Sequence, residues 1–206
     1  MNRRHMLKYA GASAAASFLG ATRLPAAQPQ VGAVAVKDAD ALRVIQRAAQ
    51  AGTMNAVWVH GTAFEAEDSG ALNGIQKMGW GTLFHGKPKA FTWFHISIPT
   101  PVIINDHRPA LEKLFVFYKE NGASIRNVHI YDGPRKIKAF DGLMLRGDQS
   151  GKIVAANTWA FAPPVTIAYG LGISIGVQFS VGFDSAITTE ILFTTAGADF
   201  RLKPAA

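Results

Sequence analysis

The chain is 206 residues long and carries 21 Lys and Arg residues against 14 Asp and Glu residues, with no cysteine. The lack of cysteine excludes a disulfide framework, thiolate metal sites and a cysteine nucleophile, so a hydrophobic core must supply the stability. Four of the basic residues precede residue 24, which leaves 17 basic against 14 acidic residues in the rest of the chain. Such a mild excess does not support nucleic acid as a partner.

The first residues resemble an export signal. Arg3 and Arg4 are followed by His5-Met6-Leu7-Lys8 and then by an uncharged stretch from Tyr9 to Thr22. This resembles the bacterial twin-arginine leader, whose motif is R-R-x-F-L-K, with Met6 where Phe is usual. The resemblance implies that the twin-arginine translocase carries the folded protein across the inner membrane, so that it becomes periplasmic or secreted.

Two alternatives to this signal are an ordinary Sec signal and a membrane anchor. The stretch from Tyr9 to Thr22 is shorter than the roughly 18–20 apolar residues that span a bilayer, so the mature protein is expected to have no transmembrane anchor. Arg23 places a positive charge directly after the apolar stretch, where Sec signals avoid one. We predict a signal peptide over residues 1–27, and the cut site stays open between residue 27 and Ala35.

Residues 28–53 are predicted to form a linker followed by one short N-terminal helix from Lys37 to Gly52. Within it Leu42, Ile45 and Ala49 fall on one helical face. Asp38 is suited to cap the start of this helix, and Gly52 is suited to end it. A mobile N-terminal arm is the alternative.

From Met54 onward the apolar pattern has a period of two. Between Gly170 and Phe183 the odd positions carry Leu, Ile, Val or Phe, while the even positions carry Gly, Ser or Gln. This alternation predicts a strand with one apolar face. The segment is long for a strand, and its glycines indicate a bulge, a bend or the close approach of another layer, so we predict a kinked pair of strands.

Further segments have strand-like composition, and turn sequences rich in Gly, Pro, Asn and Asp separate them. They are 55–60, 62–67, 81–85, 91–98, 111–119, 124–131, 137–140, 143–146, 153–161, 165–169 and 187–195. Because no crossover helices lie between them, the chain is expected to form an antiparallel sandwich or barrel. We predict an all-β fold: a jelly-roll-like antiparallel β-sandwich of about ten strands, in one domain over residues 54–200.

Two of these strands place aromatic and histidine residues on the face opposite their aliphatic residues. The candidate ligand-binding residues are Trp93, His95, Asn127, His129 and Tyr131. Flat rings of this kind stack on sugar rings, while His and Asn form hydrogen bonds with hydroxyl groups. The alternative is a second buried face, covered by a loop or by the predicted helix.

No metal-binding or hydrolytic motif is present. The five histidines beyond the leader form no H-E-x-x-H or H-x-H motif. No cofactor is predicted; a metal ion would have to be held across strands, with His85, His95 and His129 as candidates. Catalytic residues are not assigned: the G-x-S-x-G elbow is absent, and Ser174 lies within a strand pattern rather than at a strand-to-helix turn.

Three segments together resemble a known family: Trp80 to Pro88, Trp93 to Pro101 and Val128 to Gly133. They are similar to a family of uncharacterised, mainly bacterial, secreted or free-standing β-rich domains. The resemblance covers most of the chain from Trp58 to Phe179. It implies a fold unit and carries over no catalytic residue, because that family has no assigned activity.

These observations favour an exported domain that binds a ligand without catalysing a reaction, with a carbohydrate or a cell-envelope component as the ligand. One alternative is a metal-dependent enzyme that uses cross-strand histidines. Another is a structural protein that associates with itself through the small residues between Gly170 and Gly182.

Overall fold

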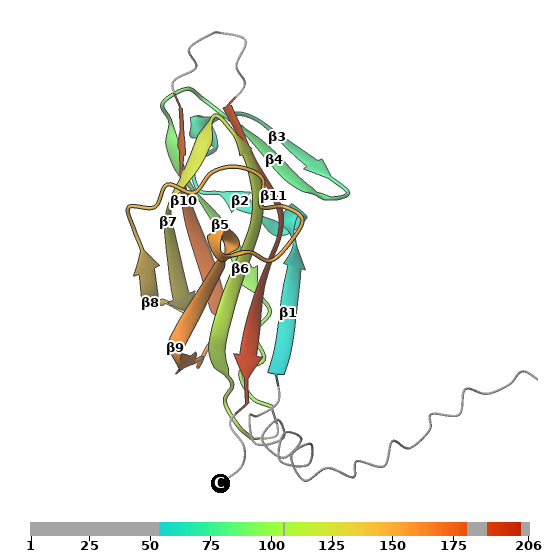
Figure 1. Cartoon of the computed structure of the whole chain (residues 1–206), viewed down its shortest axis with the longest axis vertical. Helices are drawn as coiled ribbons and strands as arrows, with labels where there is room; N and C mark the ends of the chain where they lie inside the picture. Colours follow the sequence, from blue (N-terminus) through green and yellow to red (C-terminus); the bar gives the residue numbers. More distant parts are fainter. Residues whose placement is uncertain (1–53, 105, 181–188, 203–206) are drawn as a thin grey trace, which may run out of the picture. The chain divides into compact units, whose positions relative to one another are not determined.

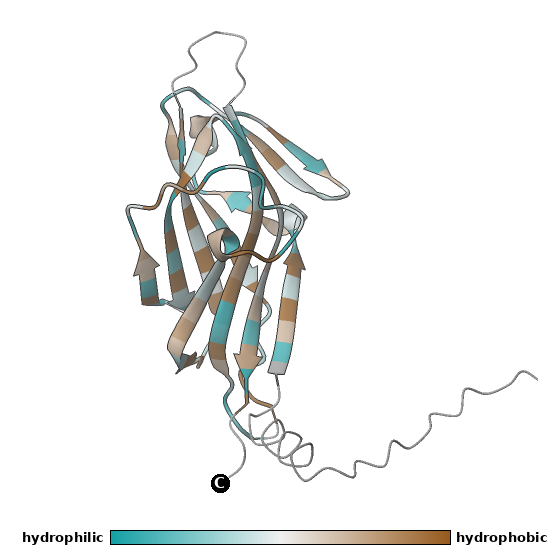
Figure 2. Cartoon of the chain, viewed as in Figure 1, coloured by the Kyte–Doolittle hydropathy of each residue, from teal (hydrophilic) through white to brown (hydrophobic). Residues whose placement is uncertain are grey.

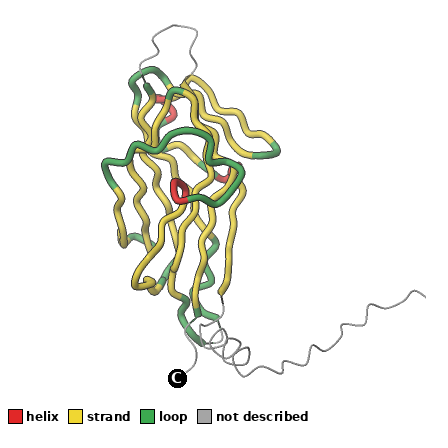
Figure 3. The backbone as a smooth tube through the Cα atoms, in the orientation of Figure 1, coloured by secondary structure: helices red, strands yellow, loops and turns green. Residues whose placement is uncertain are grey.

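The computed structural model describes residues 54–104, 106–180 and 189–202. The predicted signal peptide, linker and helix over residues 1–53 lie outside the described residues. Within the described residues the chain forms eleven strands and three short 3-10 turns, and the tube in Figure 3 is accordingly mostly strand. The predicted all-β fold is confirmed. None of the described helical turns is long and apolar enough to cross a membrane.

The strands form two antiparallel sheets (Figure 1). Sheet A has the order β3-β4-β11-β6-β9, and β1 also pairs with β11. Sheet B has the order β2-β5-β10-β7-β8. The strands of sheet A are β1 (Met54–His60), β3 (Leu72–Met78), β4 (Gly81–Gly86), β6 (Ala110–Asn121), β9 (Thr158–Thr166) and β11 (Thr189–Arg201). Those of sheet B are β2 (Glu65–Ala66), β5 (Phe91–Ile98), β7 (Ala123–Asp132), β8 (Arg135–Phe140) and β10 (Leu171–Phe179).

The two sheets pack face to face over one core. Along β10 the odd-numbered residues Ile173, Ile175 and Val177 are buried, and they belong to the same apolar cluster as Phe193 of β11. The ring of Phe193 lies 5.4 Å from that of Phe94 in sheet B, so the sheets are in direct contact. In Figure 2, bands of apolar and polar residues alternate along several strands, as expected where one face of a strand packs on the core.

The late strands insert between earlier ones. In sheet B, β10 lies between β5 and β7; in sheet A, β11 lies between β4 and β6. Strands that pair with partners distant in sequence are typical of Greek-key and jelly-roll sandwiches. The predicted antiparallel sandwich is therefore confirmed, and the insertion of β10 creates the surface described below.

The prediction of a kinked pair of strands from Gly170 onward was wrong for the described part of this segment. Leu171–Phe179 forms a single strand, and residues 181–183 lie outside the described residues. The irregularity is a register shift against β7 at Gly176 and Val177. A Cβ atom at Gly176 would lie 2.8 Å from the ring of Phe91, so the glycine permits a close approach rather than a bend.

Other strand predictions were also wrong: of the predicted strand 62–67 only Glu65–Ala66 is a strand, and Gly61–Ala63 forms a 3-10 turn. Strand β3 was not predicted because only Leu72 of its residues is buried, so the apolar alternation is missing. The segment 143–146, which was predicted to be a strand, forms only an isolated bridge between Leu145 and Ile125. The segments 153–161 and 165–169 contribute to the single strand β9, which also includes the intervening prolines.

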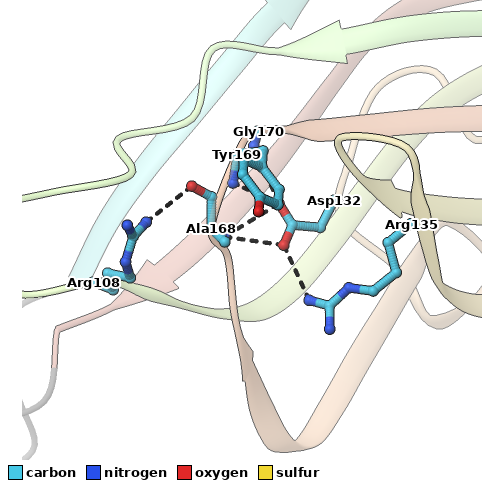
Figure 4. Close-up of polar contacts among 6 residues, drawn as sticks. All are labelled: Arg108, Asp132, Arg135, Ala168, Tyr169 and Gly170. Atoms are coloured by element: carbon cyan, nitrogen blue, oxygen red, sulfur yellow. Dashed lines mark hydrogen bonds and ion pairs between the residues drawn. The ribbon is translucent and has the colours of Figure 1, made fainter.

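A buried carboxylate holds the connection between β9 and β10 (Figure 4). Asp132, at the end of β7, is fully buried and accepts hydrogen bonds from the backbone N–H groups of residues 168–170 at 2.8–3.2 Å. Arg135 donates a further hydrogen bond to the same carboxylate at 3.1 Å. On the other side of this loop, Arg108 donates to the carbonyl oxygen of Ala168 at 2.9 Å. These bonds fix the point at which the chain enters β10.

Candidate functional site

The candidate site is the outer face of sheet B. Because β10 lies between β5 and β7, cross-strand register sets Trp93 and Asn127 on either side of Gly176. In the same way it sets His95 and His129 on either side of Ser174. Tyr131 lies beside Gly172. All five predicted ligand-binding residues thus share one face, which we call the platform: Trp93, His95, Asn127, His129 and Tyr131, with Gly172, Ser174 and Gly176 as its floor.

The small residues of β10 allow side chains from β5 and β7 to meet above it. The ring centroids of Trp93 and His129 are 4.7 Å apart, although the two residues belong to strands that are not neighbours. At Gly176 a Cβ atom would lie 3.0 Å from the side-chain oxygen of Asn127, so a larger residue there would require this side chain to move. Gly176 therefore leaves room for the side chains of Phe91 and Asn127 beside the aromatic contact.

A row of polar side chains crosses the platform through Ser174. The Oγ atom of Ser174 lies 2.9 Å from Nδ1 of His95, and Nε2 of His95 lies 3.0 Å from a carboxylate oxygen of Glu67. On the other side, Nε2 of His129 lies 2.7 Å from Oδ1 of Asp141. Glu67 and Asp141 directly follow β2 and β8, the two edge strands, so the row spans the whole sheet.

The carboxylates determine which ring nitrogen of each histidine donates a hydrogen bond. An ionised carboxylate only accepts hydrogen bonds, so in the neutral ring of His95 Nε2 donates to Glu67 and Nδ1 accepts from the Ser174 hydroxyl group. Asp141 accepts from His129 and, at 2.6 Å, from the amide of Asn127. These two hydrogen bonds, that from His129 first, hold the pKa of Asp141 below its usual value.

The platform is partly open to solvent. The side chain of His95 is 43% exposed and that of His129 is 14% exposed, and Phe91 at the upper end of the same face is 41% exposed. Core residues of the same strands, such as Phe94 and Val128, have no exposed surface. The alternative of a second buried core therefore does not describe this face.

The structure does not bring the three candidate metal-binding histidines together. His85 lies on β4 in sheet A, where its Nδ1 atom is 3.3 Å from Glu190, whereas His95 and His129 belong to sheet B. In the parts of the chain that the structure describes, no group of three or more His, Asp or Glu side chains is placed to hold a metal ion. Register separates His95 from His129 by a full strand.

Sequence reasoning missed Glu67, Asp141 and Ser174 as members of this site. Glu67 is the last residue of the predicted strand 62–67 and Asp141 lies in a turn sequence after 137–140, so the alternating pattern does not place either carboxylate beside a histidine. Ser174 was noted only as part of a strand. A usable signal was the small, partly polar face of β10, because small residues in a central strand indicate that neighbouring side chains cover it.

A concave feature lies on sheet A beside the β3–β4 hairpin. It has a volume of about 270 Å³ and is lined by Met78, Trp80, Leu83, Lys119, Glu120, Asn121, Glu190 and Leu192. Two of its charged groups already have partners within the fold. Glu120 accepts hydrogen bonds from the N–H groups of Ala123 and Gly147, and Lys119 forms an ion pair with Asp148. The platform is therefore the better candidate.

Comparison with known proteins places the chain in a family but does not supply a function. A model described as "Family of unknown function (DUF6623)" matches residues 53–201, in agreement with the resemblance to an uncharacterised domain family. No curated protein matches the chain.

Among solved structures, a family 29 carbohydrate-binding module from Piromyces equi is 12% identical, with a TM-score of 0.35 over 72% of this chain and 90% of that one. The protein TmCBM61, solved in complex with beta-1,4-galactotriose, is 11% identical, with a TM-score of 0.36 over 70% of this chain and 88% of that one. Sequence identities and TM-scores as low as these do not indicate a function for this chain.

Proposed function

This chain belongs to the family of unknown function DUF6623, and from its own site we propose that it is a carbohydrate-binding domain whose ligand lies on the platform of sheet B. The observation that carries the proposal is the contact of Trp93 with His129 over the small residues of β10. It places an aromatic ring among polar groups on a partly open surface. A few polar groups around an apolar surface are typical of small-ligand sites.

The chemistry of the platform suits a ligand with both apolar faces and hydroxyl groups. Aromatic side chains offer a flat apolar surface with specific stacking geometry, which matches the C–H faces of a sugar ring. Asn127, His95 and His129 offer N–H groups, and the carboxylates of Glu67 and Asp141 accept hydrogen bonds. A sugar presents donors and acceptors of the same kinds around its ring.

We expect the substitution Trp93→Ala to weaken carbohydrate binding by about 1–3 kcal/mol, roughly 5- to 150-fold, as the loss of an aromatic anchor does. Because Trp93 is only partly buried, the melting temperature is expected to stay within a few degrees of the parent. A glycan array identifies the oligosaccharide to use, and titration calorimetry with that oligosaccharide then measures the affinity.

The matched control is Trp80→Ala, because Trp80 is 63% exposed but lies beside the β3–β4 hairpin of sheet A. This variant is expected to bind like the parent. Equal losses in the two variants, or a parent protein that binds no glycan on the array, would contradict the proposal. A large loss of stability in Trp93→Ala would instead assign the ring to the core.

We also propose that the protein is exported by the twin-arginine route. The support is the sequence alone: Arg3 and Arg4 in the leader, before an apolar stretch too short for an anchor. Replacing both arginines with lysine is expected to keep the precursor in the cytoplasm, because the receptor for this route recognises the arginine pair. Fractionation of cells that express the parent and the double variant measures this. Undiminished export of the double variant would show that the route is a different one.

A further inference from the structure

Ser174 occupies an unusual position on the platform. Of the three residues that form the floor of the platform, only Ser174 is not a glycine. A histidine flanks it on each neighbouring strand. The geometry points to Ser174 as a nucleophile, with His95 as its base, and we propose that this face carries an acyl-transfer or ester-hydrolysis activity. This activity goes beyond the proposed binding function. Only the identity of the substrate, an O-acylated carbohydrate, rests on that proposed function.

The first requirement of a serine nucleophile is a base within hydrogen-bond reach. The distance of 2.9 Å from Ser174 Oγ to His95 Nδ1 meets it. The direction of the hydrogen bond also fits, since Glu67 accepts the proton on Nε2 at 3.0 Å and leaves the lone pair of Nδ1 facing the hydroxyl group. His95 is thus a base and Glu67 is its positioning residue, the same chain of roles as in a Ser-His-carboxylate triad.

The second requirement is a donor for the negative charge that develops on the carbonyl oxygen. Ser174 lies in a central strand, whose backbone N–H groups form hydrogen bonds with the neighbouring strands. The remaining neighbour is His129, which lies opposite Ser174 in register and is held by Asp141 at 2.7 Å. The oxyanion is assigned to the ring nitrogen of His129 that does not bind Asp141.

The third requirement is access. On its own strand Ser174 is flanked on this face by Gly172 and Gly176, and Ser174 is itself only partly buried. His95 and Glu67 have side chains that are 43% and 59% exposed. A substrate can therefore approach from solvent over a face that has no deep pocket.

Ser174 Oγ forms a bond to the acyl carbon of the ester, and its proton moves to Nδ1 of His95. The C–O bond to the alcohol then breaks, and the alcohol leaves with that proton. Water attacks the acyl-serine in the second half, which releases the carboxylic acid and restores the hydroxyl group. No metal, oxidant or reductant takes part.

A fluorophosphonate probe tests the nucleophile directly, because Ser Oγ forms a bond to phosphorus as fluoride leaves. We expect the full folded protein to be labelled once, at the peptide that contains Ser174, as read by mass spectrometry. Ser174→Ala is expected to reduce labelling to background. His95→Asn is expected to slow labelling by about 10²- to 10⁴-fold, the contribution typical of a general base.

The matched control is Ser97→Ala, because Ser97 is an exposed serine on the same face of β5, two residues from His95. Its labelling is expected to equal that of the parent. For Glu67, the positioning role predicts that Glu67→Ala slows labelling more than Glu67→Gln does, since the amide oxygen of the latter still accepts from Nε2. A merely structural role predicts equal loss in both.

The inference fails if the folded parent is not labelled at Ser174, or if His95→Asn is labelled as fast as the parent. Melting curves of each variant show whether it is folded, and the result on the parent needs no variant at all. The probe carries no sugar, so its outcome is independent of glycan binding. Glycan binding without labelling would leave the proposed function intact and overturn this inference alone.

Discussion

Replacement of Asp132 by alanine is expected to lower the free energy of unfolding by about 3–5 kcal/mol at pH 7, the cost of removing one partner of a buried charged network. The carboxylate has no exposed surface, and it accepts from three consecutive backbone N–H groups and from Arg135. Without it those N–H groups, which are only partly shielded from solvent, would lose their acceptor. The loop of residues 168–170 that leads into β10 would lose its anchor.

The same carboxylate gives this prediction a pH dependence. Burial raises the pKa of Asp132, but hydrogen bonds from residues 168–170 and from Arg135 outweigh it, so the pKa of this carboxyl lies below its usual value of 3.8. A lowered pKa in the folded state means that the unfolded chain binds the proton first. The stabilisation is therefore complete above about pH 4 and is lost as the pH falls through the folded pKa.

Denaturant unfolding of the parent and the Asp132→Ala variant at pH 7 and at successively lower pH measures both effects. The difference between the two proteins should be largest at pH 7 and should shrink below about pH 4. The control is Arg135→Ala, which removes only a mostly exposed partner and is expected to cost less than about 1 kcal/mol. If both variants lost the same stability, the ion pair rather than the backbone hydrogen bonds would be the important contact.

The substitution Ile175→Asp is expected to cost about 3–5 kcal/mol, because it places an unpaired charge in the core between the sheets. Ile175 has no exposed surface and lies in the central strand of sheet B, where it pairs in register with Phe94 and Val128. Its neighbours leave the carboxylate no polar partner from either side. Denaturant unfolding gives the change in free energy directly.

Ile75→Asp is the matched control for this prediction. It is the same substitution in strand β3, at a residue that is 46% exposed, so the carboxylate stays in contact with water. A change within about 1 kcal/mol is expected there. Comparable losses at the two positions would mean that Ile175 does not face the core, and the assignment of the two faces of β10 would be wrong.

The faces of the strands could be predicted from local patterns. In β5 the alternation of Trp93 and His95 with Phe94 and Ile96 showed which residues share a surface, because successive side chains in a strand point to opposite faces. The same pattern in β10 predicted its buried and open sides. Strand β3 shows the limit of this approach: it has one buried residue and gives no alternating signal.

The neighbours of each strand could not be predicted in the same way. Alternation assigns a residue to a face but does not say which strand lies beside it, since the pairing of β10 with β5 and β7 joins segments far apart in the chain. That pairing places Ser174 between His95 and His129 and lets Trp93 touch His129. Glu67 and Asp141 join them because both follow edge strands of the same sheet. The five candidate ligand-binding residues could therefore be identified in the sequence, whereas the contacts that make them a site, and the part that Ser174, Glu67 and Asp141 take in it, arise from long-range strand pairing.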